Sequence, residues 1–178
     1  MDKLLGKFDN PAGVCNSGNI IIDSIINYKH LVAEKYKVPF HLDINIPPQL
    51  ELDTTVISVI LGNILDNAIE ACEEKTNVDR YIKIHMHYLN ESLFMRIQNP
   101  FVHEVHTNLY GEICSTKTDK QPHGMGLRNI KKIIDECDGL SDISYSNSLF
   151  QIEIVLFKVQ SQKTIPGSLS QTKVNTVT

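Results

Sequence analysis

The chain has 178 residues, which fits one compact domain with short flexible ends. Its formal net charge is −4, which argues against a nucleic-acid partner because phosphate backbones attract basic surfaces. The four cysteines form no C-x-x-C pair, so we expect reduced thiols rather than a disulfide framework. No apolar run reaches the roughly 20 residues that span a bilayer, so we expect a cytoplasmic chain without direct membrane contact.

The first elements are a linker and a helix. Residues 1–15 are mixed and broken by proline and glycine, and we interpret them as an N-terminal linker. Helical periodicity follows and ends before Pro39, with Asn16 or Ser17 as the expected cap. The expected apolar stripe of this helix consists of Ile21, Ile25, Tyr28, Val32 and Tyr36.

A strand, a second helix and two further strands come next. Polar and apolar residues alternate over 41–46, which predicts a half-buried strand. Asp53 is the expected cap of a helix that runs to about Glu74 and is apolar over most of its circumference, so we expect it to be buried. The pattern then predicts strands over 81–89 and 93–98.

The last third of the chain begins with a long weakly periodic segment, 101–123. A loop of this length in a small domain is usually functional. A helix is predicted over 127–137, closed by Gly139 and followed by a strand hairpin over 140–157. The polar segment 158–178 has almost no core-forming pattern, and we expect a flexible C-terminal tail.

This order of elements predicts an α/β sandwich of the α+β class. We expect a mixed, mostly antiparallel sheet of about five strands with about three helices on one face. The domain itself is expected to cover residues 16–157, between the linker and the tail.

The second predicted helix carries a polar stripe. Asn63, Asn67 and Glu70 stand at positions i, i+4 and i+7, so they share one side of the helix. For a single asparagine, a satisfied core amide or a solvent-facing edge is the simpler interpretation. Three such residues in register favour oxygen ligands for Mg²⁺ or its waters, held rigidly by the helix.

The third predicted helix begins at a pair of glycines. Gly124 and Gly126 allow close backbone approach, and the free N–H groups of a helix start attract phosphate. Lys117 and Lys120 precede them and can act as point charges, while His123 can contact phosphate or serve only at the helix start. A plain loop-to-helix turn remains equally compatible with these residues.

Two other groups of polar residues have alternative interpretations. Asn99 ends a predicted strand, where it is either a turn residue or an adenine reader whose amide can both donate and accept. His85 and His87 share one face of a strand, where metal binding is a minor alternative to a surface role. His30 lies on the first predicted helix, where surface or packing use is expected.

Three of these segments, in this order and spacing, resemble the GHKL ATPase superfamily. Residues 63–68 (Asn-Ile-Leu-Asp-Asn-Ala) resemble its N box, and residues 124–127 (Gly-Met-Gly-Leu) resemble its second glycine box. Asn99 stands where the superfamily has the aspartate of the first glycine box. The resemblance implies the Bergerat fold and binding of ATP with Mg²⁺.

A narrower resemblance covers about residues 16–157. Several short motifs are similar to those of the Agr-type peptide quorum-sensing kinases: Gly18-Asn19, Asp23, Asn27-Tyr28-Lys29, residues 67–71 and residues 116–127. This resemblance implies the catalytic domain of a sensor histidine kinase, whose parent protein is anchored in the cell membrane through other segments. Its implied partners are a dimerisation and phospho-acceptor domain of the same parent and, indirectly, a response regulator.

The resemblance also implies a role for individual residues. Asn67 holds the Mg²⁺ that bridges the phosphates, Asn63 and Glu70 support that metal or its waters, and Asn99 binds adenine. Residues 101–123 form a mobile lid, with Lys117 reaching phosphate as part of the catalytic set with Asn63 and Asn67. The remaining nucleotide contacts are Lys120, His123, Gly124, Met125, Gly126 and Leu127.

Two departures from the superfamily pattern matter. The first glycine box has Asn99 in place of aspartate and lacks the glycines, so we expect less sharp discrimination of adenine. Hydrolytic relatives have glutamate where this chain has Asn63, and an amide has no useful basicity. We therefore expect negligible ATP hydrolysis and phosphoryl transfer to a protein side chain.

None of the seven histidines stands in the acceptor signature of such kinases, so we expect the acceptor on a segment N-terminal to this chain. Two alternatives remain open: a GHKL serine kinase acting in trans, and a nucleotide-binding interaction module without transfer activity. An ATP hydrolase is disfavoured by Asn63.

Overall fold

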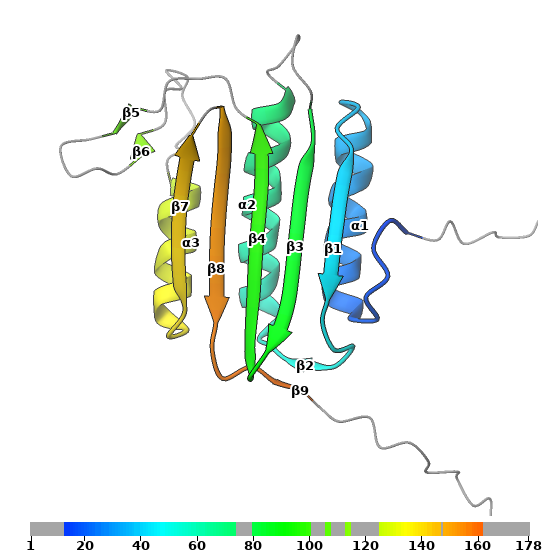
Figure 1. The fold of residues 1–178 in the computed structure, drawn as a ribbon, viewed down its shortest axis with the longest axis vertical. Coiled ribbons are helices and arrows are strands. Elements are labelled where there is room, and N and C mark those ends of the chain that lie inside the picture. The colour runs from blue at the N-terminus through cyan, green and yellow to red at the C-terminus, as the bar shows by residue number, and fades with distance from the viewer. Residues whose placement is uncertain are drawn as a thin grey trace, which may run out of the picture.

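The computed structural model describes residues 13–73, 80–100, 106–107, 113–114, 125–146 and 148–161. These residues form three helices, α1 (Ile20–Glu34), α2 (Thr54–Glu73) and α3 (Met125–Glu136). Figure 1 shows all three on one face of a five-stranded sheet. The predicted two-layer α+β sandwich is confirmed.

The sheet has the strand order β1-β3-β4-β8-β7. β1 and β3 are parallel, because α2 lies between them in the chain and returns it to the same end of the sheet. All other neighbours are antiparallel: β3–β4 and β7–β8 are hairpins joined by short turns, whereas β4 and β8 are far apart in the chain. The strand bounds are β1 Phe40–Asn45, β3 Ile82–Leu89, β4 Ser92–Pro100, β7 Leu140–Ser146 and β8 Leu149–Leu156.

Two pairs of two-residue strands were not expected from the sequence. β2 (Leu50–Glu51) pairs antiparallel with β9 (Gln160–Ser161), and β5 (His106–Thr107) pairs antiparallel with β6 (Ile113–Cys114). Strands this short carry no alternating pattern that a sequence could reveal. For the four residues of β5 and β6, the expected absence of secondary structure in 101–123 is wrong; the other residues of that segment lie outside the described part of the chain.

The folded region also extends beyond both expected limits. Val159 is 3 % exposed, and its carbonyl oxygen accepts a hydrogen bond from the Tyr88 hydroxyl at 2.8 Å. Cys15, which falls within the expected linker, is 5 % exposed and joins the core. Neither residue belongs to a sustained alternating or helical pattern, so periodicity could not identify it. Residues 1–12 and 162–178 lie outside the described part.

The cap of helix α1 lies two residues after Ser17 and three after Asn16, the two expected caps, and its buried stripe differs in part from the expected one. Asn19, rather than Asn16 or Ser17, caps it, since its side-chain oxygen accepts from the Ile22 N–H at 3.1 Å. The fully buried side chains are Ile22, Ile26 and Ala33. Of the expected stripe, Ile25, Val32 and Tyr36 are partly buried against the core, whereas Ile21 and Tyr28 are 37 % and 62 % exposed. The three consecutive isoleucines at the helix start offer two stripes one residue apart, and only tertiary packing selects between them.

Helix α2 is the centre of the core. Asp53 caps it as predicted, accepting from the Thr55 and Val56 N–H groups at 2.7 and 3.2 Å. α2 packs against α1, α3 and β4. It is the one described helix that is long and apolar enough to cross a membrane by length and composition, and the core helix of a folded domain meets the same criterion. Its buried residues are Ile57, Ile60, Leu61, Ile64, Leu65, Ala68, Ile69 and Cys72.

Two side chains of α1 fasten the preceding loop to the helix. Asn27 exchanges two hydrogen bonds with the backbone of Cys15, at 2.8 and 2.9 Å. The Asp23 carboxylate accepts from the Ser17 hydroxyl at 2.7 Å and from the Ser17 and Gly18 N–H groups at 3.0 Å each. Gly18 has a φ of +90°, which favours glycine at this turn. The motif residues at 18, 23 and 27 therefore fix the entry of the chain into the domain.

These bonds set the acidity of both side chains at this loop. Partial burial raises the pKa of the Asp23 carboxyl, but hydrogen bonds from Ser17, Cys15 and Gly18 outweigh it and hold the pKa below its ordinary value. Burial, with the neighbouring Asp23, raises the pKa of the Cys15 thiol to about 12. The thiol therefore stays protonated and donates to Asp23 at 3.1 Å.

We expect Asp23→Asn to destabilise the domain in a pH-dependent way. The folded-state pKa of Asp23 is lowered, so its stabilisation is complete above the unfolded value of 3.8 and is lost as the pH falls through the folded value. The difference in free energy of unfolding between wild type and variant should thus be largest near neutral pH and shrink below about pH 4. Urea denaturation at several pH values measures it; a difference that does not change with pH would contradict the assignment.

Gly62 lies in the middle of α2, and a Cβ atom built there meets nothing within 4 Å. We expect Gly62→Ala to raise the free energy of unfolding by about 0.5–1 kcal/mol, because alanine loses less backbone entropy on forming a helix. The matched control is Gly139→Ala just after α3, where a Cβ would lie 2.8 Å from the Ile134 side chain and 2.9 Å from the Val155 carbonyl oxygen. Denaturant titration should show opposite signs; a loss of stability in Gly62→Ala would contradict this.

Candidate functional site

Three elements that carry the predicted site residues converge at one end of the sandwich. The C-terminal ends of α2 and β4 and the N-terminal start of α3 lie at the same end in Figure 1. α2 packs against both β4 and α3. β3 follows α2 and runs away from this end of the sandwich, so its antiparallel partner β4 runs back to it. α3 starts at this end and leads to β7. Sequence segments about 60 residues apart therefore come together as the motif order implied.

The polar stripe of α2 is accessible to solvent. Asn63 is exposed, and Asn67 and Glu70 are half-buried, whereas the adjacent Ile64 and Ala68 are buried. The stripe thus runs beside the buried face of the helix, at the margin of the core. The apolar contacts of one side fix the helix, so the amides and carboxylate of the other are held in place.

The two asparagines of the stripe differ in their hydrogen bonding. The Asn63 amide donates to the Val59 carbonyl one turn earlier in the helix, at 2.7 Å. Within the described part of the chain, the Asn67 side chain makes no hydrogen bond. The Asn67 amide oxygen is therefore available to a ligand, whereas the amide of Asn63 is turned to its own backbone.

Asn99 is buried on the helix-covered face of the sheet. It follows Leu93, Met95 and Ile97 along the inward side of β4 and is 2 % exposed. The sequence placed it at the end of the strand, but pairing with β8 continues through Asn99 and Pro100. Its amide nitrogen donates to the Pro100 carbonyl at 3.2 Å. Among the described residues its amide oxygen has no donor, which is costly for a buried amide unless a ligand supplies one.

An ion pair that sequence reasoning missed fixes α1 beside this stripe. The Lys29 ammonium lies 2.6 Å from the Asp66 carboxylate, and their side chains are 14 % and 60 % exposed. Asp66 directly precedes Asn67 in the chain. Both residues stood in quoted motifs, and their opposite charges were the available signal. Because the pair is partly exposed, its contribution is positional more than energetic.

The remaining predicted residues are only partly placed. Lys117, Lys120, His123 and Gly124 lie outside the described part of the chain. Met125 and Gly126 form the first turn of α3, where backbone N–H groups are free of helical partners. Leu127 is partly buried and packs against the core, so its side chain stabilises the helix and its predicted nucleotide contact would fall to the backbone.

The described residues fit a Mg²⁺-bound nucleotide. Asn67 and Glu70 offer oxygen atoms one helical turn apart, the ligand type that Mg²⁺ prefers. The first turn of α3 offers N–H donors and the positive end of a helix dipole to phosphate. Asn99 offers a buried acceptor and donor to a planar heterocycle.

Comparisons with known proteins identify the family and the fold of the chain. Residues 52–157 match the family model described as the GHKL domain. None of the curated proteins matches the chain. Among solved structures, the catalytic domain of the histidine kinase ThkA superposes with a TM-score of 0.60 at 20 % identity, over 80 % of this chain and 94 % of that one.

Two further solved structures share the fold at lower similarity. The histidine kinase AdeS of Acinetobacter baumannii has a TM-score of 0.57 at 17 % identity over 78 % of this chain. The present chain covers 63 % of the AdeS chain, and so less than two thirds of it. The mycobacterial sensor histidine kinase MprB has a TM-score of 0.52 at 15 % identity, over 76 % of this chain and 94 % of that one. At these identities the likeness establishes the fold.

Proposed function

The chain belongs to the GHKL domain family, and on that premise we propose that it is the ATP-binding catalytic domain of a two-component sensor histidine kinase. Its fold is shared with the catalytic domain of the histidine kinase ThkA. The motifs at residues 18–29, 67–71 and 116–127 favour the Agr-type peptide quorum-sensing branch. The same resemblance supports a cytoplasmic domain of a parent protein anchored in the cell membrane.

One observation carries the proposal. The polar stripe of α2 runs toward the end of the sandwich where β4 ends beside the buried Asn99 and where α3 begins. Asn67 there makes no hydrogen bond within the described residues, and the Asn99 oxygen has no donor among them. A metal–phosphate group next to an adenine would satisfy both amides and the first turn of α3 together.

Each residue then has a proposed role in binding. Asn67 ligates the Mg²⁺, which neutralises charge developing on the phosphates, and Glu70 and Asn63 orient its waters. Asn99 accepts from the exocyclic amine of adenine and donates to a ring nitrogen. Segment 101–123 is the proposed lid, with Lys117 and Lys120 reaching phosphate. His123, Gly124, Met125, Gly126 and Leu127 complete the phosphate side through backbone and ring N–H groups.

The proposed reaction transfers the γ-phosphoryl group to a histidine on a dimerisation domain of the same parent. The bond from phosphorus to the bridging oxygen of ADP breaks, a phosphorus–nitrogen bond to the imidazole forms, and the imidazole proton leaves to solvent. Hydrolysis is disfavoured because Asn63 has no basicity and its amide already bonds the Val59 carbonyl. A response regulator would then receive the phosphoryl group from that histidine.

A histidine kinase and a GHKL serine kinase share such a nucleotide site, but the phosphorylated residues that they form differ in stability. A phosphohistidine is labile in acid, whereas the phosphoserine made by a serine kinase acting in trans is stable there. Acid treatment of the phosphorylated parent protein therefore decides between them.

The nucleotide site is tested by calorimetric titration with a non-hydrolysable ATP analogue, with and without Mg²⁺. We expect Mg²⁺-assisted binding that Asn67→Ala weakens at least about tenfold, because hydrogen bonds and ligation to charged groups contribute about 1.5–3 kcal/mol. The matched control is Asn45→Ala at the exposed end of β1, outside the proposed site, which should bind as the wild type does.

Absence of nucleotide binding under every condition would contradict the proposal and leave the non-catalytic interaction module. Equal binding by wild type and Asn67→Ala would remove Asn67 from the metal site while leaving the nucleotide pocket in place.

Asn99→Ala tests adenine recognition separately. We expect it to lower affinity for the ATP analogue by up to about tenfold, since one neutral hydrogen bond contributes about 0.5–1.5 kcal/mol net. A guanine analogue should be affected less, so the preference for adenine should narrow. Competition titrations with both analogues measure this, and an unchanged preference would place Asn99 outside the base pocket.

A further inference from the structure

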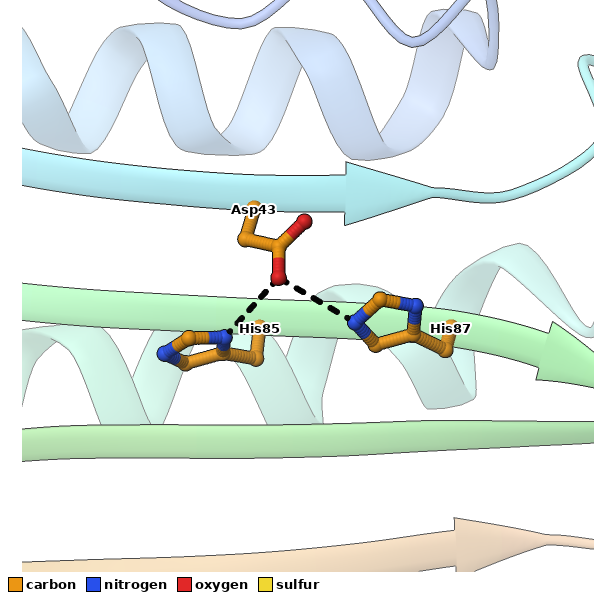
Figure 2. Close-up of side chains that lie close together, drawn as sticks. All are labelled: Asp43, His85 and His87. Carbon is orange, nitrogen blue, oxygen red and sulfur yellow. Dashed lines mark hydrogen bonds and ion pairs between the residues drawn. The ribbon is translucent and has the colours of Figure 1, made fainter.

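The face of the sheet opposite the helices carries a second cluster of ligand-type side chains. Asp43 of β1 lies beside His85 and His87 of β3, and Figure 2 shows its carboxylate pointing between the two imidazole rings. One carboxylate oxygen, Oδ2, is 3.2 Å from His85 Nδ1 and 3.3 Å from His87 Nε2. Asp43, His85 and His87 alternate with the more buried residues of their strands, on the face opposite to the helices, so they have no part in the proposed nucleotide site.

Backbone pairing produces this arrangement. Asp43 is the registered partner of His85 in the parallel pair of β1 and β3. His87 is two residues farther along β3, on the same face, so the carboxylate reaches both rings. The sequence placed the two histidines on one face of a strand, but the third ligand comes from another strand and is brought in by the parallel pairing.

The distances, one of which is also that of a hydrogen bond between His85 and Asp43, are compatible with a shared metal ion. Ligand atoms about 2.0–2.2 Å from a tetrahedral Zn²⁺ lie about 3.3 Å from one another. The two carboxylate-to-ring distances are close to this value, and all three ligand atoms lie within 4.8 Å of one another.

Two basic side chains near the cluster, Arg96 and Lys83, contact other groups than Asp43. Arg96 of β4 opposes His85 across the strand pair, but its Nε donates to the Glu153 carboxylate of β8 at 2.5 Å. Lys83, two residues before His85 on β3, lies with its ammonium over the Tyr81 ring, 5.0 Å from the centroid. Asp43 therefore faces two imidazole rings rather than a lysine or arginine side chain. This arrangement leaves its carboxylate charge available to a metal dication.

We propose that Asp43, His85 and His87 form a binding site for one first-row transition-metal dication of the zinc class. Two imidazoles favour Zn²⁺, Ni²⁺ or Cu²⁺ over Mg²⁺, which prefers oxygen ligands alone. Side-chain exposures of 58 %, 35 % and 49 % give solvent access, so water completes the coordination shell. The bound ion would cross-link β1, an edge strand, to β3.

The site is tested by titrating the whole chain with Zn²⁺ in the absence of nucleotide. Excess Mg²⁺ is present throughout, so that only a site selective for Zn²⁺ is measured. We expect binding that His87→Ala lowers at least about tenfold, since even the outer-shell partners of metal ligands are worth about 10–100-fold. Asp43→Asn should have a similar effect and guards against misfolding of the first variant. His41→Ala is the matched control, because His41 is exposed on the same face of β1 but is not in the cluster.

Two further measurements distinguish this site from adventitious binding by other histidines or cysteines. Saturating Zn²⁺ should raise the melting temperature of wild type and His41→Ala but not of His87→Ala, because binding to the folded state alone adds stability. Asn67→Ala should keep the effect, which separates it from the nucleotide site. Zn²⁺ affinity that is equal in wild type, His87→Ala and Asp43→Asn would overturn the proposal, as would absence of binding.

The ring atoms give an independent spectroscopic test. In the geometry of the cluster, Zn²⁺ takes Nδ1 of His85 and Nε2 of His87, so the remaining protons must be on Nε2 and Nδ1 respectively. Long-range ¹H–¹⁵N spectra of the imidazoles should show these two opposite tautomers when Zn²⁺ is added. Identical tautomers, or no change at either ring, would contradict the assigned ligands.

Discussion

The packing of α2 against the sheet is the contact on which the rest of the structure depends. Eight buried apolar residues hold one side of this helix against β4, α1 and α3. The remaining side carries Asn63, Asn67 and Glu70 at the edge of the core. A polar group can only be placed accurately if its backbone is fixed by something else, and here burial of the opposite side does so. The same helix therefore supplies both stability and the proposed metal ligands.

The long elements could be predicted from sequence because their periodicity is sustained, whereas the choices that depend on distant contacts could not. The bounds of α2 follow from the Asp53 cap and the apolar run, and the β3–β4 and β7–β8 hairpins follow from alternation around short turns. The buried stripe of α1 was predicted only in part: Ile25, Val32 and Tyr36 pack against the core, but consecutive isoleucines fit two helical faces, and the central side chains are Ile22 and Ile26. The pairing of β2 with β9 joins residues about 110 positions apart, and nothing local in either strand indicates it.

In the candidate site, too, the features set by local spacing could be predicted, whereas those set by distant contacts could not. Helical spacing alone put Asn63, Asn67 and Glu70 on one stripe, and the structure leaves that stripe accessible. The ion pair of Lys29 and Asp66 and the joining of Asp43 to the histidines needed the positions of α1 and β1 relative to their neighbours. Parallel pairing of β1 and β3 is set by the long connection through α2, so its register cannot be inferred from either strand.

The burial of position 99 explains why an amide is more easily accommodated there than a carboxylate. At 2 % exposure a carboxylate would lose nearly all its hydration, and its burial would be costly without a charge partner. Among the described residues no cation contacts Asn99, whose nitrogen bonds only the Pro100 carbonyl. An amide is cheaper to bury and still offers both a donor and an acceptor to a base. In the proposed adenine site, asparagine would therefore replace a strong, charge-assisted contact by a neutral one, and this buried strand end accommodates the neutral amide in the absence of ligand.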